Sequence, residues 1–257
     1  MKIDFSTITV YELIALILSF TAIVIPVIKW AWNRWFVKPI LNHLPTGKIY
    51  PSFDIMGSYL KIESVYGALN KPIVVKNIAL RMIRNRDEKV LNQNWSAFYS
   101  PLTQTYNGGL AYSSEWAHPF RIEKDSLVTV FTVFEDFSHS LQRSLAKYDV
   151  EEKIFAKDCV KQSLGYNEAL DMFKQQSFFK DVKDVLMQYF FWEIGKYDIE
   201  LIVKYENEQR TFSYRFEINE TEYEKLVHNM NEILFAPIKQ EFNQPMDFQS
   251  VTLKLED

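Results

Sequence analysis

Residues 10–28 read VYELIALILSFTAIVIPVI, a run of 19 residues in which Glu12 is the only charged side chain. A helix of this length spans about 28 Å, close to the bilayer hydrocarbon thickness of about 30 Å. Glu12 lies one turn from the start, where a carboxylate can reach the interface. The run therefore predicts a transmembrane helix. With the interfacial residues that follow, it occupies 10–35, and residues 1–9 form a short tail.

The residues that flank this run favour the membrane–water interface. Trp and Tyr rings gather at headgroup depth, and basic side chains extend from the bilayer toward water. The predicted interfacial residues are Tyr11, Lys29, Trp30, Trp32, Arg34, Trp35 and Lys38. Pro26 predicts a local bend, with a functional hinge as the alternative. A buried core helix is the alternative to a membrane span, and the length of the apolar run disfavours it.

The surroundings of the run also predict that it is retained and how it is oriented. A cleaved signal peptide has a basic start and a small-residue exit, whereas Asp4 and Glu12 precede most of this run and Lys-Trp-Ala-Trp-Asn-Arg follows it. Three basic residues follow the run and only Lys2 precedes it. The positive-inside rule then predicts an inner-membrane protein with its N-terminus outside and its C-terminal domain in the cytoplasm.

Composition bounds the rest of the 257-residue chain. Hydrophobic residues make up 47% and aromatic residues 16%, which predicts a packed core. The single cysteine, Cys159, excludes an internal disulfide framework. The net charge is −4, and the first 38 residues hold four basic and two acidic residues, so the remainder carries about −6. This balance argues against a nucleic-acid partner. The densest basic stretch, 81–89, is interrupted by Asp87 and Glu88, and we interpret this stretch as a solvated strand end.

The segment 36–52 contains three prolines and Gly47, and it predicts a linker ahead of one domain at 53–257. Alternation predicts a strand pair at 59–63 and 74–83, joined by a turn at 70–72. A short aromatic strand follows at 95–99, and Asn107-Gly108-Gly109 predicts a hairpin turn. Residues 127–134 are apolar on both faces, which is typical of a central strand.

The second half of the chain changes pattern. Helical spacing predicts one or two helices within 138–192, whose terminal cluster 189–192 we assign to the core rather than to a membrane surface. The clearest hairpin pairs 197–205 with 212–218. Asn219 and Glu222 form a capping-box pattern that opens a helix, which Ala236-Pro237 ends. The late alternation around Val251 predicts either an edge strand or a frayed tail.

This order of elements predicts an α+β fold: a mainly antiparallel β-sandwich with a helical insertion at about 138–192 and a late helix. The strand succession resembles the immunoglobulin-like sandwiches in architecture. Their Cys and Trp core signature is absent, so the resemblance implies no functional residues.

No motif for catalysis, metal or cofactor binding is found. The histidines, His43, His118, His139 and His228, lack metal-site spacing. Cys159 has no basic or glycine-rich setting, which favours a packed thiol. The adjacent acids Glu135-Asp136 and Glu151-Glu152 have the residue type for acid–base work or for a divalent ion, although such pairs more often end strands and helices in water. The sequence predicts no catalytic residue, metal or cofactor.

An anchor beside a well-patterned domain without catalytic residues favours a membrane-tethered, non-enzymatic protein-interaction or accessory module. The expected partners are membrane lipid, an unidentified protein and a possible second copy of the chain. One alternative is an oligomerising membrane effector that perturbs the bilayer on sensing a signal, as in bacterial stress or phage defence. Another is an enzyme with no recognisable motif.

Overall fold

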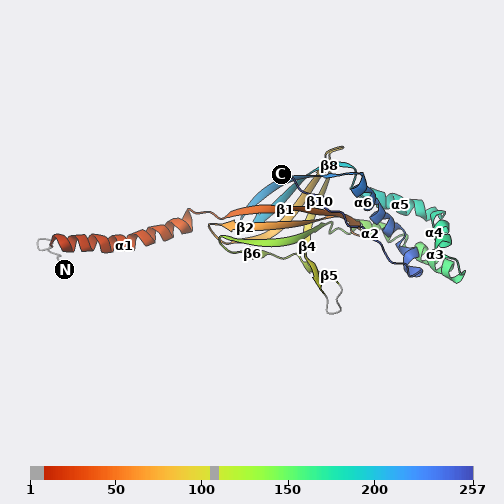
Figure 1. Ribbon diagram of the computed structural model, residues 1–257, viewed down its shortest axis with the longest axis horizontal. Helices are drawn as coiled ribbons and strands as arrows, with labels where there is room; N and C mark the ends of the chain where they lie inside the picture. Colours follow the sequence, from red (N-terminus) through yellow and green to blue (C-terminus); the bar gives the residue numbers. More distant parts are fainter. Residues whose placement is uncertain (1–8, 105–109, 257) are drawn as a thin grey trace.

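The structure is a computed structural model that describes residues 9–104 and 110–256, with side chains except at 100–104 and 110–113. The hairpin turn predicted at 107–109 lies outside the described residues. An N-terminal helix, a β-barrel-like sheet and a helical cap follow one another along the long axis of the molecule (Figure 1).

Helix α1, Val10–Trp35, matches the predicted segment. Thr9 and Glu12 close a capping box, with the Thr9 backbone N–H donating to Glu12 Oε2 at 2.8 Å. Pro26 lies inside the helix without ending it. The helix has a mean hydropathy of 2.3 over its most apolar window and no buried residue, so it is long and apolar enough to cross a membrane. Length and composition alone do not separate such a helix from a signal sequence.

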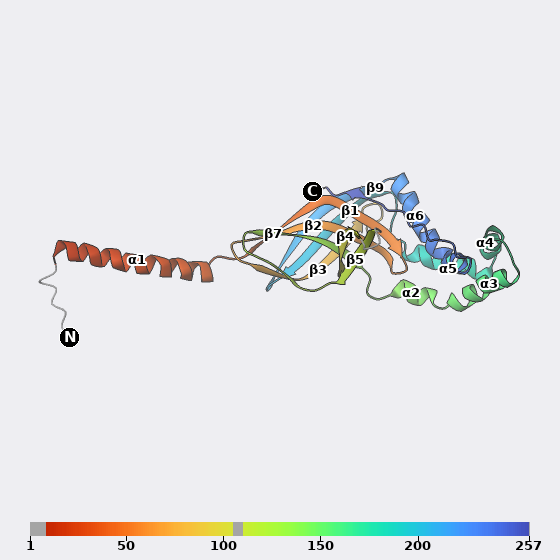
Figure 2. The same ribbon diagram turned by 60° about the horizontal axis from the view of Figure 1, so that its bottom comes forward.

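A single antiparallel sheet forms the body of the molecule. Its strands are β1 Ile40–Asp54, β2 Gly57–Leu69, β3 Ile73–Arg84, β4 Lys89–Gln104, β5 Leu110–Trp116, β6 Phe120–Ile122, β7 Ser126–Glu135, β8 Gly195–Tyr205, β9 Glu208–Ile218 and β10 Leu253–Lys254. The order is β10-β1-β2-β7-β4-β3-β8-β9, with β5 added to β4 and β6 to β3. The strands twist around a shared interior (Figures 1 and 2).

The short strand β10 brings the two ends of this sheet together. It pairs with β1 at Lys48–Lys254 and Ile49–Leu253, and Arg215 of β9 forms a bridge with Glu256. Side chains span the rest of the seam. Arg210 of β9 donates to the Leu41 carbonyl of β1 at 2.5 Å. The sheet is therefore a nearly closed barrel.

The predicted immunoglobulin-like sandwich is replaced by this barrel. Both architectures need strands that alternate between inward apolar and outward polar side chains, so alternation does not separate them. What separates them is the pairing of distant segments, above all β10 with β1. The predicted late alternation is a strand, and its residues Val251, Leu253 and Leu255 are buried.

Two further predictions are wrong in detail. The predicted linker 36–52 is largely strand, since β1 begins at Ile40 and tolerates its prolines beside a register shift between Pro45 and Ile49. The strands at 59–63 and 74–83 exist within β2 and β3 but do not pair with each other: β2 lies between β1 and β7, and β3 pairs with β4, β6 and β8. The central position of β7 and the β8–β9 hairpin are confirmed.

Six helices cap the end of the barrel away from α1 (Figure 2). They are α2 Ser140–Leu145, α3 Asp149–Lys161, α4 Tyr166–Lys174, α5 Ser177–Tyr189, α6 Glu220–Leu234 and α7 Ala236–Glu241. The insertion thus holds four helices instead of one or two, because turns such as the one at Ser163, with φ of 57°, break the helical pattern. The capping box at Asn219 and Glu222 is confirmed.

One core runs from the barrel into the cap. Trp192 is fully buried, and its indole Nε1 donates to the Ser52 carbonyl at 2.8 Å, so the assignment of 189–192 to the core is confirmed for Phe190, Phe191 and Trp192.

The basic stretch 81–89 is more than a solvated strand end. Arg84 is buried, donates to the Phe191 carbonyl at 2.7 Å and pairs with Glu193 at 3.0 Å. A buried guanidinium with these partners has a structural role.

Candidate functional site

A groove crosses the outer face of β1, β2 and β7. It consists of two adjoining cavities of about 420 Å³ and 550 Å³ that share Tyr59, Lys61 and Tyr99. These volumes lie in the range of about 300–1,000 Å³ typical of ligand sites. We call this surface the outer groove.

Strand alternation explains why these side chains face outward. Leu60, Ile62 and Ser64 of β2 are buried inside the barrel, so Tyr59, Lys61 and Glu63 project to the other side. On the neighbouring strand β7, Phe131, Val133 and Glu135 occupy the same face, because Lys61 pairs with Val133 and Glu63 with Phe131. The floor of the groove is therefore a regular part of the sheet.

The walls come from two irregular segments. A register shift in β4 between Trp95 and Ala97 interrupts its pairing with β7, which resumes at Ala97 and Phe98. From Ala97 onward β4 also pairs with β5, which projects from the barrel (Figure 1). Trp116, at the end of β5, forms one rim and is 80% exposed. The segment 248–251 forms the opposite rim, where Phe248 is 48% exposed. Large exposed aromatic rings beside a cavity are typical of interaction surfaces.

Lys61 occupies the centre of the groove. Its Nζ lies 5.5 Å from the centroid of the Tyr59 ring and 5.4 Å from that of Tyr99, within the range of cation–π attraction. The Tyr99 ring in turn contacts Phe131 at a centroid distance of 5.4 Å. Burial lowers the pKa of Lys61, while Asp54 and Glu135 act in the opposite direction.

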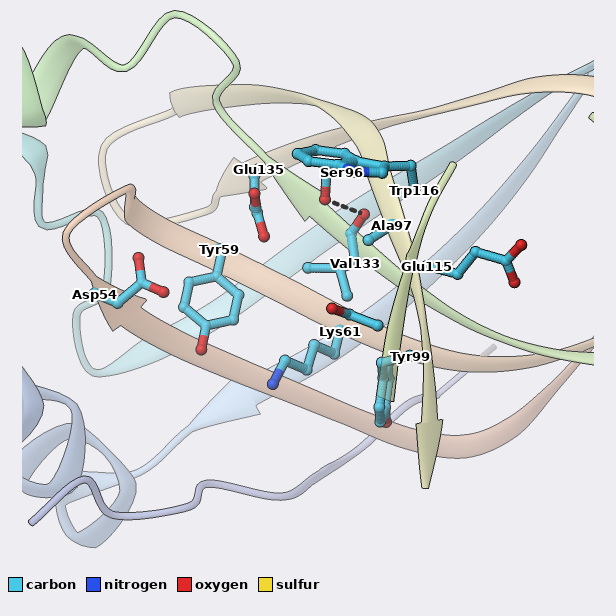
Figure 3. A pocket seen from close by; sticks show the side chains of 11 residues that line it. Asp54, Tyr59, Lys61, Ser96, Ala97, Tyr99, Glu115, Trp116, Val133 and Glu135 are labelled. Atoms are coloured by element: carbon cyan, nitrogen blue, oxygen red, sulfur yellow. Dashed lines mark hydrogen bonds between the residues drawn. The ribbon is translucent and has the colours of Figure 1, made fainter. Parts of the chain in front are cut away.

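Asp54 and Glu135 lie at the same end of the groove as Tyr59 (Figure 3). Burial raises the pKa of Asp54, and burial together with the negative charge of Asp54 raises the pKa of Glu135. Burial and both carboxylates raise the pKa of Tyr59 to about 12. Each carboxylate therefore loses hydration without a full counter-charge, and further positive charge would stabilise both.

The predicted interfacial residues lie at the two ends of α1. Tyr11 is in the first turn, and Lys29, Trp30, Trp32, Arg34 and Trp35 lie in the last two turns. All four aromatic rings are exposed. From Tyr11 to Trp30 the helix rises about 28 Å. Lys38, in the connector to β1, pairs with Glu208 at 3.7 Å.

The other sequence candidates are scattered. Cys159 is buried in α3. His43 is buried inside the barrel, where Nδ1 lies 2.6 Å from the Tyr214 hydroxyl and burial lowers its pKa to about 4. His228 bonds to the Asp247 carbonyl at 2.8 Å. Within residues 9–104 and 110–256, no group of three or more His, Cys, Asp or Glu side chains is placed to hold a metal ion.

Sequence reasoning found only part of the outer groove. The adjacent acids Glu135-Asp136 were flagged for their residue type, and Glu135 is in the groove. Asp54, Lys61 and Trp116 were missed, because they lie on β1, β2 and β5, and strand pairing through β7 and β4 brings them together. The available signal was the alternation in β2. The side chains of Tyr59, Lys61 and Glu63, on the outer face, are aromatic or charged, whereas the inward-facing Leu60 and Ile62 are apolar.

The fold and the groove define the chain as a barrel-like β-domain with an apolar N-terminal helix and a helical cap. No protein-family model matches the sequence, and no curated protein matches it. Among solved structures, the chain is similar to a family 123 glycoside hydrolase from Clostridium perfringens, with 10% identity and a TM-score of 0.32. The match covers 71% of this chain and 28% of that enzyme. At this TM-score the similarity assigns neither a fold nor an activity.

Proposed function

We propose that this chain is a membrane-tethered, non-enzymatic interaction module, held at the cytoplasmic face of the membrane by α1, that binds a protein partner in the outer groove. The observation that carries the proposal is the outer groove itself: an aromatic-lined pair of cavities on a domain whose apolar N-terminal helix has no buried residue. Tethering would raise the local concentration of the groove for partners at the membrane.

The short junction between α1 and the barrel supports a position of the barrel close to the membrane surface. Only Val37, Lys38 and Pro39 separate the cap residue Phe36 from the start of β1, and three extended residues reach about 10 Å. Lys71, in the β2–β3 turn, donates to the Arg34 carbonyl at 3.0 Å, which places a cation at the helix C-terminus. Asn70 donates to the Lys38 carbonyl at 3.2 Å.

The groove chemistry favours a partner segment with basic and apolar side chains. Asp54, Glu63, Glu115 and Glu135 line the groove against the single ammonium of Lys61. Complementary charge steers association and fixes orientation, and aromatic rings supply contact area and cation–π attraction. An extended peptide with lysine or arginine beside apolar residues meets both requirements.

Photo-crosslinking in intact membranes tests this proposal. A benzophenone amino acid at Trp116 and, separately, at Phe248 should capture the same protein, because the two positions form opposite rims of one groove. The same probe at Thr211, exposed on β9, serves as the control and should not. The double variant Asp54→Asn with Glu135→Gln should reduce the adduct at least tenfold. Adducts with lipid alone, or equal capture at all three positions, would refute the proposal.

A second candidate function is an enzyme, and the opposed pKa shifts in the outer groove favour it. The pKa of Lys61 is lowered, whereas the pKa values of Asp54 and Glu135 are raised. Catalytic sites show such opposed shifts, and so do structural ion-pair networks. Native mass spectrometry of the purified chain separates the two functions. A retained small molecule that is lost in Tyr59→Phe favours the enzyme, and a chain without one favours the interaction module.

A further inference from the structure

A further cavity, of about 460 Å³, lies between the helices of the cap and reaches Ile55 in the β1–β2 turn, the residue after Asp54 of the outer groove. Helices α2 and α3 form one side, and the end of α6 with α7 forms the other. Its wall is mostly apolar, with Leu145, Ala146, Ile233, Ala236, Pro237 and Met246 among the lining residues. We call it the cap cavity. Its size suits a small organic molecule.

One carboxylate in this wall lacks a partner. Glu152 of α3 is 8% exposed and lines the cap cavity. Among the described residues its side chain makes no hydrogen bond and no ion pair. The nearest basic neighbour in sequence, Lys153, instead bonds to Asp149 at 2.7 Å.

The same cap contains a second buried glutamate with a complete set of partners. Glu232 of α6 is 5% exposed. Its carboxylate oxygens accept hydrogen bonds from Lys239 Nζ at 2.6 Å and 2.7 Å and from the backbone N–H of Asp247 at 2.8 Å. The charge of Glu232 is therefore compensated by an ammonium group and a backbone N–H. Glu152 is similarly buried but has no such partner among the described residues.

The electrostatic setting of Glu152 leaves room for a cation. Burial, followed by the negative charge of Asp149, raises its pKa to about 7, and Lys153 acts weakly in the opposite direction. The other polar residues in the wall are the neutral amides Gln142 and Gln240 and the charged pair Asp149 and Lys153, whose charges offset each other across a 2.7 Å contact. The wall therefore has a net negative charge when Glu152 is ionised. Near neutral pH the carboxyl is therefore partly ionised within an apolar cavity, and an ammonium or guanidinium group would stabilise its charged form.

We propose that the cap cavity binds a small organic cation, a primary ammonium or guanidinium with a short hydrocarbon body, and that Glu152 is its counter-ion. The apolar wall would contact the hydrocarbon part while the carboxylate contacts the charged end. This site is independent of the outer groove and of the partner proposed there. Failure of one proposal would leave the other intact.

Calorimetric titration of the full chain in detergent tests the site, with n-butylammonium as the cation and 1-butanol as its neutral isostere. At pH 8, butylammonium should bind saturably and butanol should not. Glu152→Gln should weaken butylammonium binding at least tenfold. Glu151→Gln removes the adjacent, exposed carboxylate and should leave binding unchanged.

Two further arms keep the result decisive. Ala236→Phe fills the cap cavity without altering its charges and should also abolish binding. In the wild type, affinity should fall as the pH drops from 8 to 5.5, since protonation removes the counter-ion. Equal binding in Glu152→Gln and wild type, equal binding of butanol, or no saturable binding at pH 8 would each overturn the proposal.

Discussion

Lys61 is the residue on which the charge balance of the outer groove depends, because it is the one ammonium facing Asp54 and Glu135 there. Its stem crosses the space between the Tyr59 and Tyr99 rings, so it contributes packing as well as charge. The result is a groove in which the carboxylates keep raised pKa values even with the lysine present. Any change at Lys61 therefore acts on both carboxylates at once.

Replacing Lys61 by methionine should lower the free energy of unfolding by about 1–2 kcal/mol at pH 8 and by less at pH 5. Without the ammonium, the pKa values of Asp54 and Glu135 rise further. Their charged forms then cost more at high pH, whereas protonation relieves the cost at low pH. Urea unfolding at the two pH values measures the difference. Lys157→Met, an exposed change on α3, should show no pH-dependent effect.

Glu152 should make the chain less stable as the pH rises. Its pKa in the folded state, about 7, lies above the ordinary glutamate value, so the folded state binds the proton more tightly. Stability is then greatest below about pH 4.5 for this group and declines through pH 7. Glu152→Gln should accordingly stabilise the chain by about 1–2 kcal/mol at pH 8 and have little effect at pH 5. A stabilisation independent of pH would contradict this assignment.

At the scale of elements, β10 does more than its two residues suggest. It lies antiparallel to β1, and Glu256, two residues after it, bridges to Arg215 of β9, so this segment closes the seam of the barrel. Val251, Leu253 and Leu255 are all buried, which makes the segment part of the core. Without β10, the edges of β1 and β9 would be exposed strand edges, which favour aggregation.

Leu253→Ala should therefore destabilise the chain by about 2–3 kcal/mol, through lost burial and a residual cavity. Lys254→Ala, on the same strand but facing solvent, should change stability by less than about 0.5 kcal/mol. Thermal unfolding of the two variants beside the wild type measures the contrast. Equal, small effects would show that the seam closes without β10.

Local patterns in the sequence predicted most elements but not how they join. The apolar run of α1, the capping box at Asn219, the two apolar faces of β7, and the alternation of β8 and β9 each report a local requirement for burial or capping. The barrel and the outer groove depend on pairings between segments far apart, such as Ile49 with Leu253. Lys61 and Trp116 share a site because Lys61 pairs with Val133 of β7, Val133 with Ala97 of β4, and Ala97 with Trp116 of β5.

Glu152 shows the same boundary at a single residue. The sequence marks Glu151-Glu152 as adjacent acids, and an amphipathic α3 would place at least one of them in water. The structure exposes Glu151 and buries Glu152 against α6 and α7, which begin more than 60 residues later. Which carboxylate is buried depends on how the cap helices pack, and this packing has no local signal.

At the scale of the whole molecule, the elements are arranged in a line from α1 through the barrel to the helical cap (Figure 1). The α1 end carries the aromatic and basic residues expected at a membrane interface, and the far end carries the cap cavity. The outer groove lies between them on the flank of the barrel. In the proposed membrane-tethered arrangement, the outer groove and the cap cavity both face the aqueous side of the membrane.

We propose that α1 holds this domain at the cytoplasmic face of a membrane. Labelling of a Cys159→Ser, Lys157→Cys variant with a membrane-impermeant maleimide, in intact and then in permeabilised cells, tests it most directly. Lys157 is exposed on α3, at the end of the molecule away from α1. If the domain lies in the cytoplasm, labelling occurs only after permeabilisation, in the membrane fraction. Labelling of intact cells, or a labelled chain that is soluble and lacks α1, would contradict it.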